Sequence, residues 1–95
     1  MTGKSLRLHL SIRRNALPAV NVVLPFSVDN SPTISKLLEQ VNEVILLESG
    51  EWGLEDYVVE LRNPEGELFE CLHFQLVKDI IKDGETVLYA TSRCL

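Results

Sequence analysis

The chain has 95 residues, of which 45% are hydrophobic and 24% are charged, and these proportions are typical of one globular domain. Its formal net charge of −5 at pH 7 argues against general nucleic-acid binding, which normally requires a strongly basic face. Two cysteines are too few for a disulfide framework or a structural zinc site, and no apolar run is long enough for a signal peptide or a membrane span. We therefore expect one intracellular domain that contacts neither nucleic acid nor membrane directly.

The first two predicted elements are strands that form an antiparallel hairpin. In residues 5–13 and again in residues 20–26, apolar residues recur at every second position, which is the period of a half-buried strand. Turn residues 15–18 connect the two strands. Pro25 cannot donate to a ladder, so it predicts that the second strand is an edge strand or that Pro25 lies at the frayed end of one. The residues expected to face the core are Leu6, Leu8, Leu10, Ile12, Val20, Val22, Leu24 and Phe26.

A helix is predicted over residues 33–45. Residues 29–33 supply capping side chains, and Pro32 can occupy the first turn. Apolar residues at spacings of three and four then form one core-facing stripe, which consists of Ile34, Leu37, Leu38, Val41 and Ile45. A longer helix would place Leu47 in water, so we expect it to end near Ile45 or Leu46.

The second half of the chain carries three more predicted strands. They cover residues 56–62, 68–71 and 86–91, and a turn at residues 63–66 links the first two. Residues 73–82 are predicted to be irregular or to form a single helical turn.

This order of elements resembles the ubiquitin-like β-grasp fold over essentially the full length, and the stretch VKDIIKDGETVLYA resembles the ending of ubiquitin-like domains. The resemblance implies an α+β fold with a mixed sheet of four to five strands, in the order strand-strand-helix-strand-strand-strand, and one main helix. Its last strand would lie parallel to the first in the middle of the sheet, with Val87 and Tyr89 beside Leu8 and Leu10. The alternative is another small α+β roll.

The last residues bear on the kind of ubiquitin-like protein. Modifiers and sulfur carriers of this family end in Gly-Gly, whereas this chain ends in Arg93, Cys94 and Leu95. We therefore expect residues 1–95 to be a single ubiquitin-like domain and an N-terminal fragment of a longer protein.

A closer resemblance concerns the stretches LRLHLSIRR, LLEQVNEVILLESGEWGLEDYVVEL and ECLHF. They look like the N-terminal domains of coilin-type nuclear proteins and of some large fungal proteins. This resemblance implies self-association or partner recruitment in the nucleus.

Cys71 and His73 have the residue types of a nucleophile and its base. Two residues apart on a strand, they would lie about 6.5–7 Å apart, which exceeds hydrogen-bond reach. A buried thiol and a structural histidine are the favoured interpretation, and we predict no enzyme, no metal site and no cofactor. Trp52 is interpreted as a lid over the helix end, with a binding anchor as the alternative.

The charge distribution gives a first interaction hypothesis. Basic side chains are expected on the solvent side of one end of the sheet and acidic ones in loops elsewhere, so that copies could stack head to tail, as Phox-and-Bem and CIDE domains do. The residues concerned are Lys4, Arg7, Arg13 and Arg14 against Glu51, Glu55, Asp56, Glu65 and Glu67. An ordinary solvated surface is the alternative, because single surface charge pairs contribute only about 0–1 kcal/mol.

A second hypothesis concerns Val23, Val58 and Leu88, which are predicted to alternate away from the core. Exposed aliphatic side chains on adjacent strands would form a partner site, comparable to the aliphatic patch of ubiquitin. We thus predict a non-catalytic protein-interaction or self-association module. The alternative is a ubiquitin-like adaptor that binds a ubiquitin receptor or a proteasomal partner through this patch.

Overall fold

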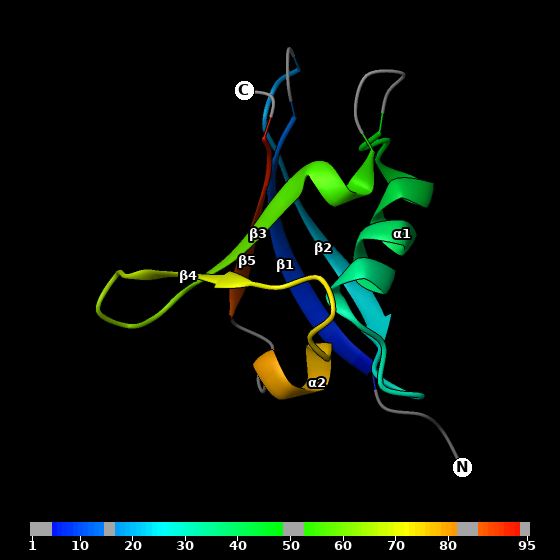
Figure 1. Cartoon of the computed structure of the whole chain (residues 1–95), viewed down its shortest axis with the longest axis vertical. Helices are drawn as coiled ribbons and strands as arrows, with labels where there is room; N and C mark the ends of the chain where they lie inside the picture. The colour runs from blue at the N-terminus through cyan, green and yellow to red at the C-terminus, as the bar shows by residue number, and fades with distance from the viewer. Residues whose placement is uncertain (1–4, 15–16, 49–52, 82–85, 94–95) are drawn as a thin grey trace.

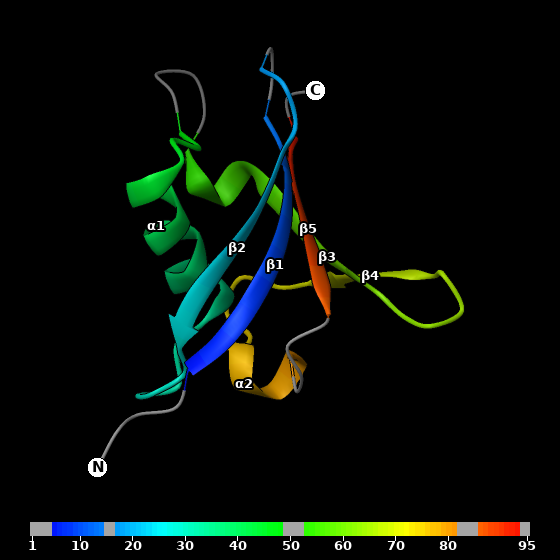
Figure 2. The ribbon, with the colours of Figure 1, turned by 180° about the vertical axis from the view of Figure 1, so that it is seen from behind.

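The computed structural model describes residues 5–14, 17–48, 53–81 and 86–93, and its strands form one sheet with the main helix packed along one face (Figures 1 and 2). The elements are β1 (Ser5–Arg13), β2 (Val20–Ser27), α1 (Ile34–Val44), the 3-10 turn η1 (Leu54–Asp56), β3 (Tyr57–Arg62), β4 (Leu68–Cys71), α2 (Val77–Ile80) and β5 (Val87–Ser92). None of the described helices is both long and apolar enough to cross a membrane.

The strand order in the sheet is β2-β1-β5-β3-β4. The last strand, β5, runs parallel to β1 and antiparallel to β3, so it joins the hairpin β1–β2 to the hairpin β3–β4. This confirms the predicted α+β fold, with a mixed sheet, one main helix and a central final strand. Pro25 lies on the edge strand β2, as its missing N–H predicts.

The helix α1 begins with Thr33 as its N-cap, because the Thr33 hydroxyl accepts a hydrogen bond from the Lys36 N–H at 3.2 Å. Pro32 therefore precedes the cap instead of occupying the first turn. The loop after β4 satisfies two further helix donors, since the N–H groups of the first two helical residues donate to carbonyls of His73 and Gln75. The buried residues of the helix are Ile34, Leu37, Leu38 and Val41.

Leu47 is buried in the core, which agrees with the prediction that the helix stops before it, since a longer helix would have placed Leu47 in water. The helix ends at Val44, so the angular spacing of a helix no longer determines where Leu47 points. Two side chains hold its backbone: Asn42 Oδ1 accepts its N–H at 2.8 Å, and the Tyr57 hydroxyl donates to its carbonyl at 2.6 Å. The chain after the helix thus folds back onto the core.

The inward and outward residues of β5 are the reverse of those predicted. Leu88 and Ala90 are buried, and Leu88 pairs with Leu10 of β1, whereas Val87 and Tyr89 face away from the core. A shift of one residue moves every side chain of a strand to the other face. Residues 87–90 are all apolar or aromatic, so no polar residue in this stretch indicates which side chains face the core and which face solvent.

Candidate interaction surfaces

No described helix covers the face of the sheet opposite α1, and we call this surface the open face (Figure 2). Alternation along the strands places half-buried or exposed side chains there from all five strands. The strand register makes His9 the direct neighbour of Val23 on one side and of Val87 on the other. These three residues form a row across β2, β1 and β5, which we call the central row. Val23 is its most accessible member, with 51% of its surface exposed.

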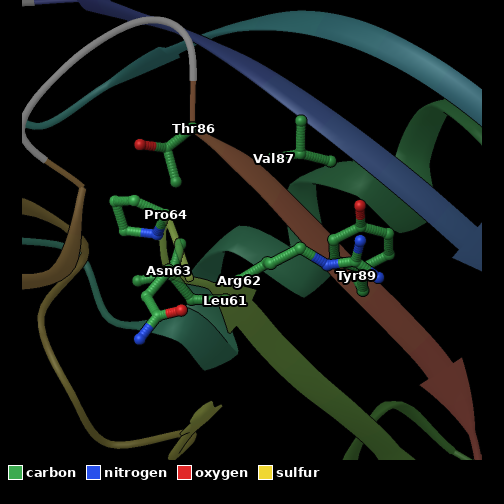
Figure 3. A pocket seen from close by; sticks show the side chains of 7 residues that line it. All are labelled: Leu61, Arg62, Asn63, Pro64, Thr86, Val87 and Tyr89. Carbon is green, nitrogen blue, oxygen red and sulfur yellow. The ribbon is translucent and has the colours of Figure 1, made fainter. Parts of the chain in front are cut away.

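Next to the central row, the open face contains a hollow of about 500 Å³ where β3 and β5 meet (Figure 3). The Arg62 guanidinium lies over the Tyr89 ring, with its Cζ atom 5.3 Å from the ring centroid, which is a cation–π geometry. The hollow can take an apolar or acidic side chain, since its walls are mainly apolar and carry one guanidinium. The lining residues are Leu61, Arg62, Asn63, Pro64, Thr86, Val87 and Tyr89.

The predicted aliphatic patch is not formed as proposed. Leu88 is fully buried, so its assignment to an exposed patch is wrong. Val23 and Val58 do lie on the open face, but β1 and β5 separate their strands, which places them at least roughly 14 Å apart. Val87, which the sequence prediction placed in the core, lies half-buried on the open face of the central strand β5.

The predicted basic residues do not share one end of the sheet. Arg7 and Arg13 both lie on the open face of β1, but they are six positions apart, which corresponds to about 20 Å along a strand. Arg14 turns to the helix side, where its Nη1 donates to the Leu46 carbonyl at 3.3 Å and its Nε is buried. Lys4 lies outside the described residues.

The predicted acidic residues also divide into two groups. Glu55 and Asp56 precede β3, whereas Glu65 and Glu67 lie in the turn between β3 and β4. Two of these carboxylates serve local turns: Asp56 accepts the Gly53 N–H at 2.9 Å, and Glu67 accepts the side-chain N–H of its turn neighbour at 3.0 Å. Stacking of copies through these charges stays a prediction, as does the role of Glu51, which lies outside the described residues.

A group of exposed apolar side chains that the sequence interpretation did not use surrounds β4. They are Leu68, Phe69, Leu72 and Phe74. The sequence contained one indication of this group, the adjacent apolar residues Leu68 and Phe69. Adjacent residues of a strand point to opposite faces of the sheet, so both can be buried only if other elements cover both faces. β4 is an edge strand, and here neither residue is buried.

Cys71 and His73 have structural roles. The Cys71 side chain lies in the core, and burial raises the pKa of its thiol, with the Glu70 and Glu60 carboxylates adding to the effect. His73 Nε2 donates to the Tyr57 carbonyl at 2.8 Å. In the described part of the chain, no group of three or more His, Cys, Asp or Glu residues could hold a metal ion. Trp52 lies outside the described residues.

The Cys71 thiol is expected to react slowly in the folded protein. In a Cys94→Ser variant, alkylation by iodoacetamide at pH 8 should be at least about 10-fold slower in native buffer than in urea, because a buried thiol with a raised pKa supplies little accessible thiolate. Mass spectrometry over time measures the two rates, and glutathione corrects for the effect of urea on the reagent. Equal corrected rates would contradict the burial of this side chain.

The comparisons with known proteins agree with this architecture. Residues 6–92 match the family model described as Domain of unknown function (DUF7357). The RA domain of a guanine nucleotide exchange factor for Rap1 is similar, with a TM-score of 0.59 and 17% identity over 98% of this chain and 79% of that one. The ubiquitin-like domain of an Arabidopsis thaliana protein is similar as well, with a TM-score of 0.55 and 9% identity over 95% of this chain and 81% of that one.

No curated protein matches the sequence. At these identities, the two structural similarities show the fold alone, and that fold is the ubiquitin-like β-grasp. The resemblance to coilin-type and large fungal nuclear proteins stays a prediction.

Proposed function

The chain belongs to the family described as Domain of unknown function (DUF7357), and we propose that it is a non-catalytic domain that binds a protein partner through the open face of its sheet. The observation that carries this proposal is the central row of Val23, His9 and Val87, which crosses three strands on a face that no described helix covers. Val23 is exposed in this row, whereas His9 and Val87 are half-buried, so two aliphatic side chains flank an imidazole. Grouped aliphatic side chains on a sheet face mark interaction sites more often than isolated apolar residues do.

The open face also suggests what the partner surface carries. Burying a valine side chain that was exposed contributes about 1.5–3 kcal/mol, so the central row favours an apolar partner surface. The adjacent hollow has room for one partner side chain between Pro64 and Val87. Arg62 stands at its wall and can donate charge-assisted hydrogen bonds to a carboxylate. We therefore infer a partner that presents aliphatic side chains with an acidic group nearby.

Within this proposal, the domain acts as one module of a longer intracellular protein, and its nuclear residence is a proposal that rests on resemblance. A ubiquitin receptor or a proteasomal protein is one class of partner that would bury an aliphatic sheet face. Such a partner would contact Val23 and Val87, because Leu88 is in the core.

The test compares an open-face variant with a matched variant on the helix. Val23→Glu combined with Val87→Glu should weaken binding of a captured and purified partner by at least about 10-fold, because a carboxylate would be buried in an apolar contact. Val44→Glu is the control, since Val44 is 68% exposed on α1. Isothermal titration calorimetry measures the affinities, and circular dichroism checks that each variant is folded.

The proposal would be contradicted if the open-face variant bound the partner with the same affinity as the Val44→Glu variant. Light scattering of the wild-type protein at low and high salt adds a second criterion. Two results together would assign the interaction to basic-to-acidic stacking instead. The apparent mass would fall as the salt concentration rises, and Arg13→Glu alone would abolish partner binding.

A further inference from the structure

The strand β4 has a free edge whose backbone groups are oriented for pairing. It lies at the end of the sheet, and among the described strands it pairs only with β3. At the turn between them, the Asn63 N–H donates to the Glu67 carbonyl at 2.9 Å. Hydrogen-bonded pairs alternate along an antiparallel ladder, so Phe69 bonds to β3. Its neighbours Leu68 and Glu70 therefore direct their N–H and C=O groups outward.

The other sheet edge, β2, is less suited to pairing. Pro25 interrupts its donors, and proline is one of the usual means by which natural proteins protect an edge. β4 contains neither proline nor lysine. Its free edge ends at Leu72, whose N–H donates to Gln75 Oε1 at 2.7 Å. Two outward residues remain, Leu68 and Glu70, which is enough to align one short added strand.

On the open face, the β4 edge carries carboxylates, while Arg62, which lies opposite Leu68 on β3, is directed over the Tyr89 ring of β5. Glu70 stands directly opposite Glu60 in the ladder, and like charges in that position are unfavourable. Arg93 reaches Glu70 at 3.8 Å and offsets part of this repulsion, although both side chains are about half exposed and the pair is weak. Burial is the main cause of the raised pKa of the neighbouring Cys71 thiol, and the Glu70 and Glu60 carboxylates add to it. A cation on an added strand would relieve the repulsion.

On the helix side, the same edge is apolar. Phe69 points to this side of the sheet, as its alternation with Glu70 requires, and 53% of its surface is exposed. An added strand would therefore meet an aromatic ring on one face and carboxylates on the other.

We propose that the free edge of β4 is a docking site for an extended peptide strand in which basic residues alternate with apolar ones. The outward backbone groups of Leu68 and Glu70 pair with the peptide backbone, as in other cases of strand addition. The apolar residues of the peptide pack against Phe69, and its lysines or arginines lie beside Glu70, with Glu60 one strand further into the sheet. This site goes beyond the open-face interaction and does not depend on it.

The experiment is an NMR titration of the folded domain with two synthetic octapeptides. One alternates valine and lysine, and the other alternates valine and glutamate. The lysine peptide, in millimolar excess, should shift the amide signals of residues 68–70 and neighbouring β3 residues most. It should bind at least about 10-fold more tightly than the glutamate peptide, and added salt should reduce the difference.

Variants of the edge provide the matched controls. Leu68→Pro removes an outward N–H and should abolish the shifts, whereas Leu68→Ala keeps that donor and should retain most of them. If Leu68→Pro does not fold, Glu70→Lys replaces it and should reverse the preference in favour of the glutamate peptide. Val23→Glu with Val87→Glu should leave the titration unchanged, so failure of the open-face proposal is distinguishable from failure of this one.

Several results would overturn the proposal. They are equal affinity for both peptides, shifts confined to the open face, and no shift at residues 68–70. Dimerisation of the domain through β4 without peptide would also overturn it, because the occupant of the edge would then be a second copy.

Discussion

Leu88→Ala is expected to lower the free energy of unfolding by about 2–5 kcal/mol, which is the usual cost of removing a buried leucine side chain. Leu88 is fully buried in β5 and pairs with Leu10 on one side and Leu61 on the other. Because strands flank β5 on both sides, the backbone has little freedom to close the cavity. Urea denaturation followed by circular dichroism measures the change, and an unchanged slope would show that the unfolding transition is otherwise the same.

Val87→Ala is the matched control for this prediction. Val87 precedes Leu88 in the same strand, but its side chain is half-exposed on the open face, so its truncation should cost about 1 kcal/mol or less. If Leu88→Ala cost no more than Val87→Ala, the inward and outward positions of β5 would be reversed, and Leu88 would belong to the surface after all.

Tyr57→Phe should lower the free energy of unfolding by about 1–3 kcal/mol, because it removes one buried hydrogen bond without changing the packing of the ring. The Tyr57 side chain is fully buried, and its hydroxyl donates at 2.6 Å to the carbonyl of Leu47, itself a core residue. The bond ties the segment after α1 to the start of β3. Chemical denaturation measures the loss.

Tyr89→Phe serves as the comparison for this substitution. Tyr89 lies half-exposed on the open face under the Arg62 guanidinium, and its substitution should change stability by roughly 0.5 kcal/mol or less. A Tyr57→Phe protein as stable as the Tyr89→Phe protein would show that the Leu47 carbonyl finds an equivalent donor.

The sequence was most informative where polar residues mark the faces of an element. In β1, Arg7, His9 and Ser11 separate the apolar residues, so the core face was predicted correctly. Pro25 identified an edge strand for a chemical reason, because it lacks a backbone donor. In β5, by contrast, the apolar residues are consecutive, so either set of alternate residues could face the core. Only pairing with the neighbouring strands determines which set does.

The candidate surfaces were harder to predict, because they depend on which strands become neighbours and where the sheet ends. The central row joins Val23, His9 and Val87 through the β1–β5 register, which connects opposite ends of the chain. The exposure of Phe69 follows from the edge position of β4, which local pattern does not reveal. Arg14 follows the last residue of β1, and its position on the helix side is shown by its hydrogen bond to the Leu46 carbonyl and not by strand alternation.

The central position of β5 has a consequence for how the protein is made. Neither hairpin contacts the other in the sheet until β5 enters between β1 and β3. At ribosomal rates of about 5–20 residues per second, the stretch from Ser27 to Ser92 takes roughly 3–13 s to synthesise. Throughout that interval the edge of β1 that later pairs with β5 has no partner strand, so it is open to mispairing while the chain is synthesised.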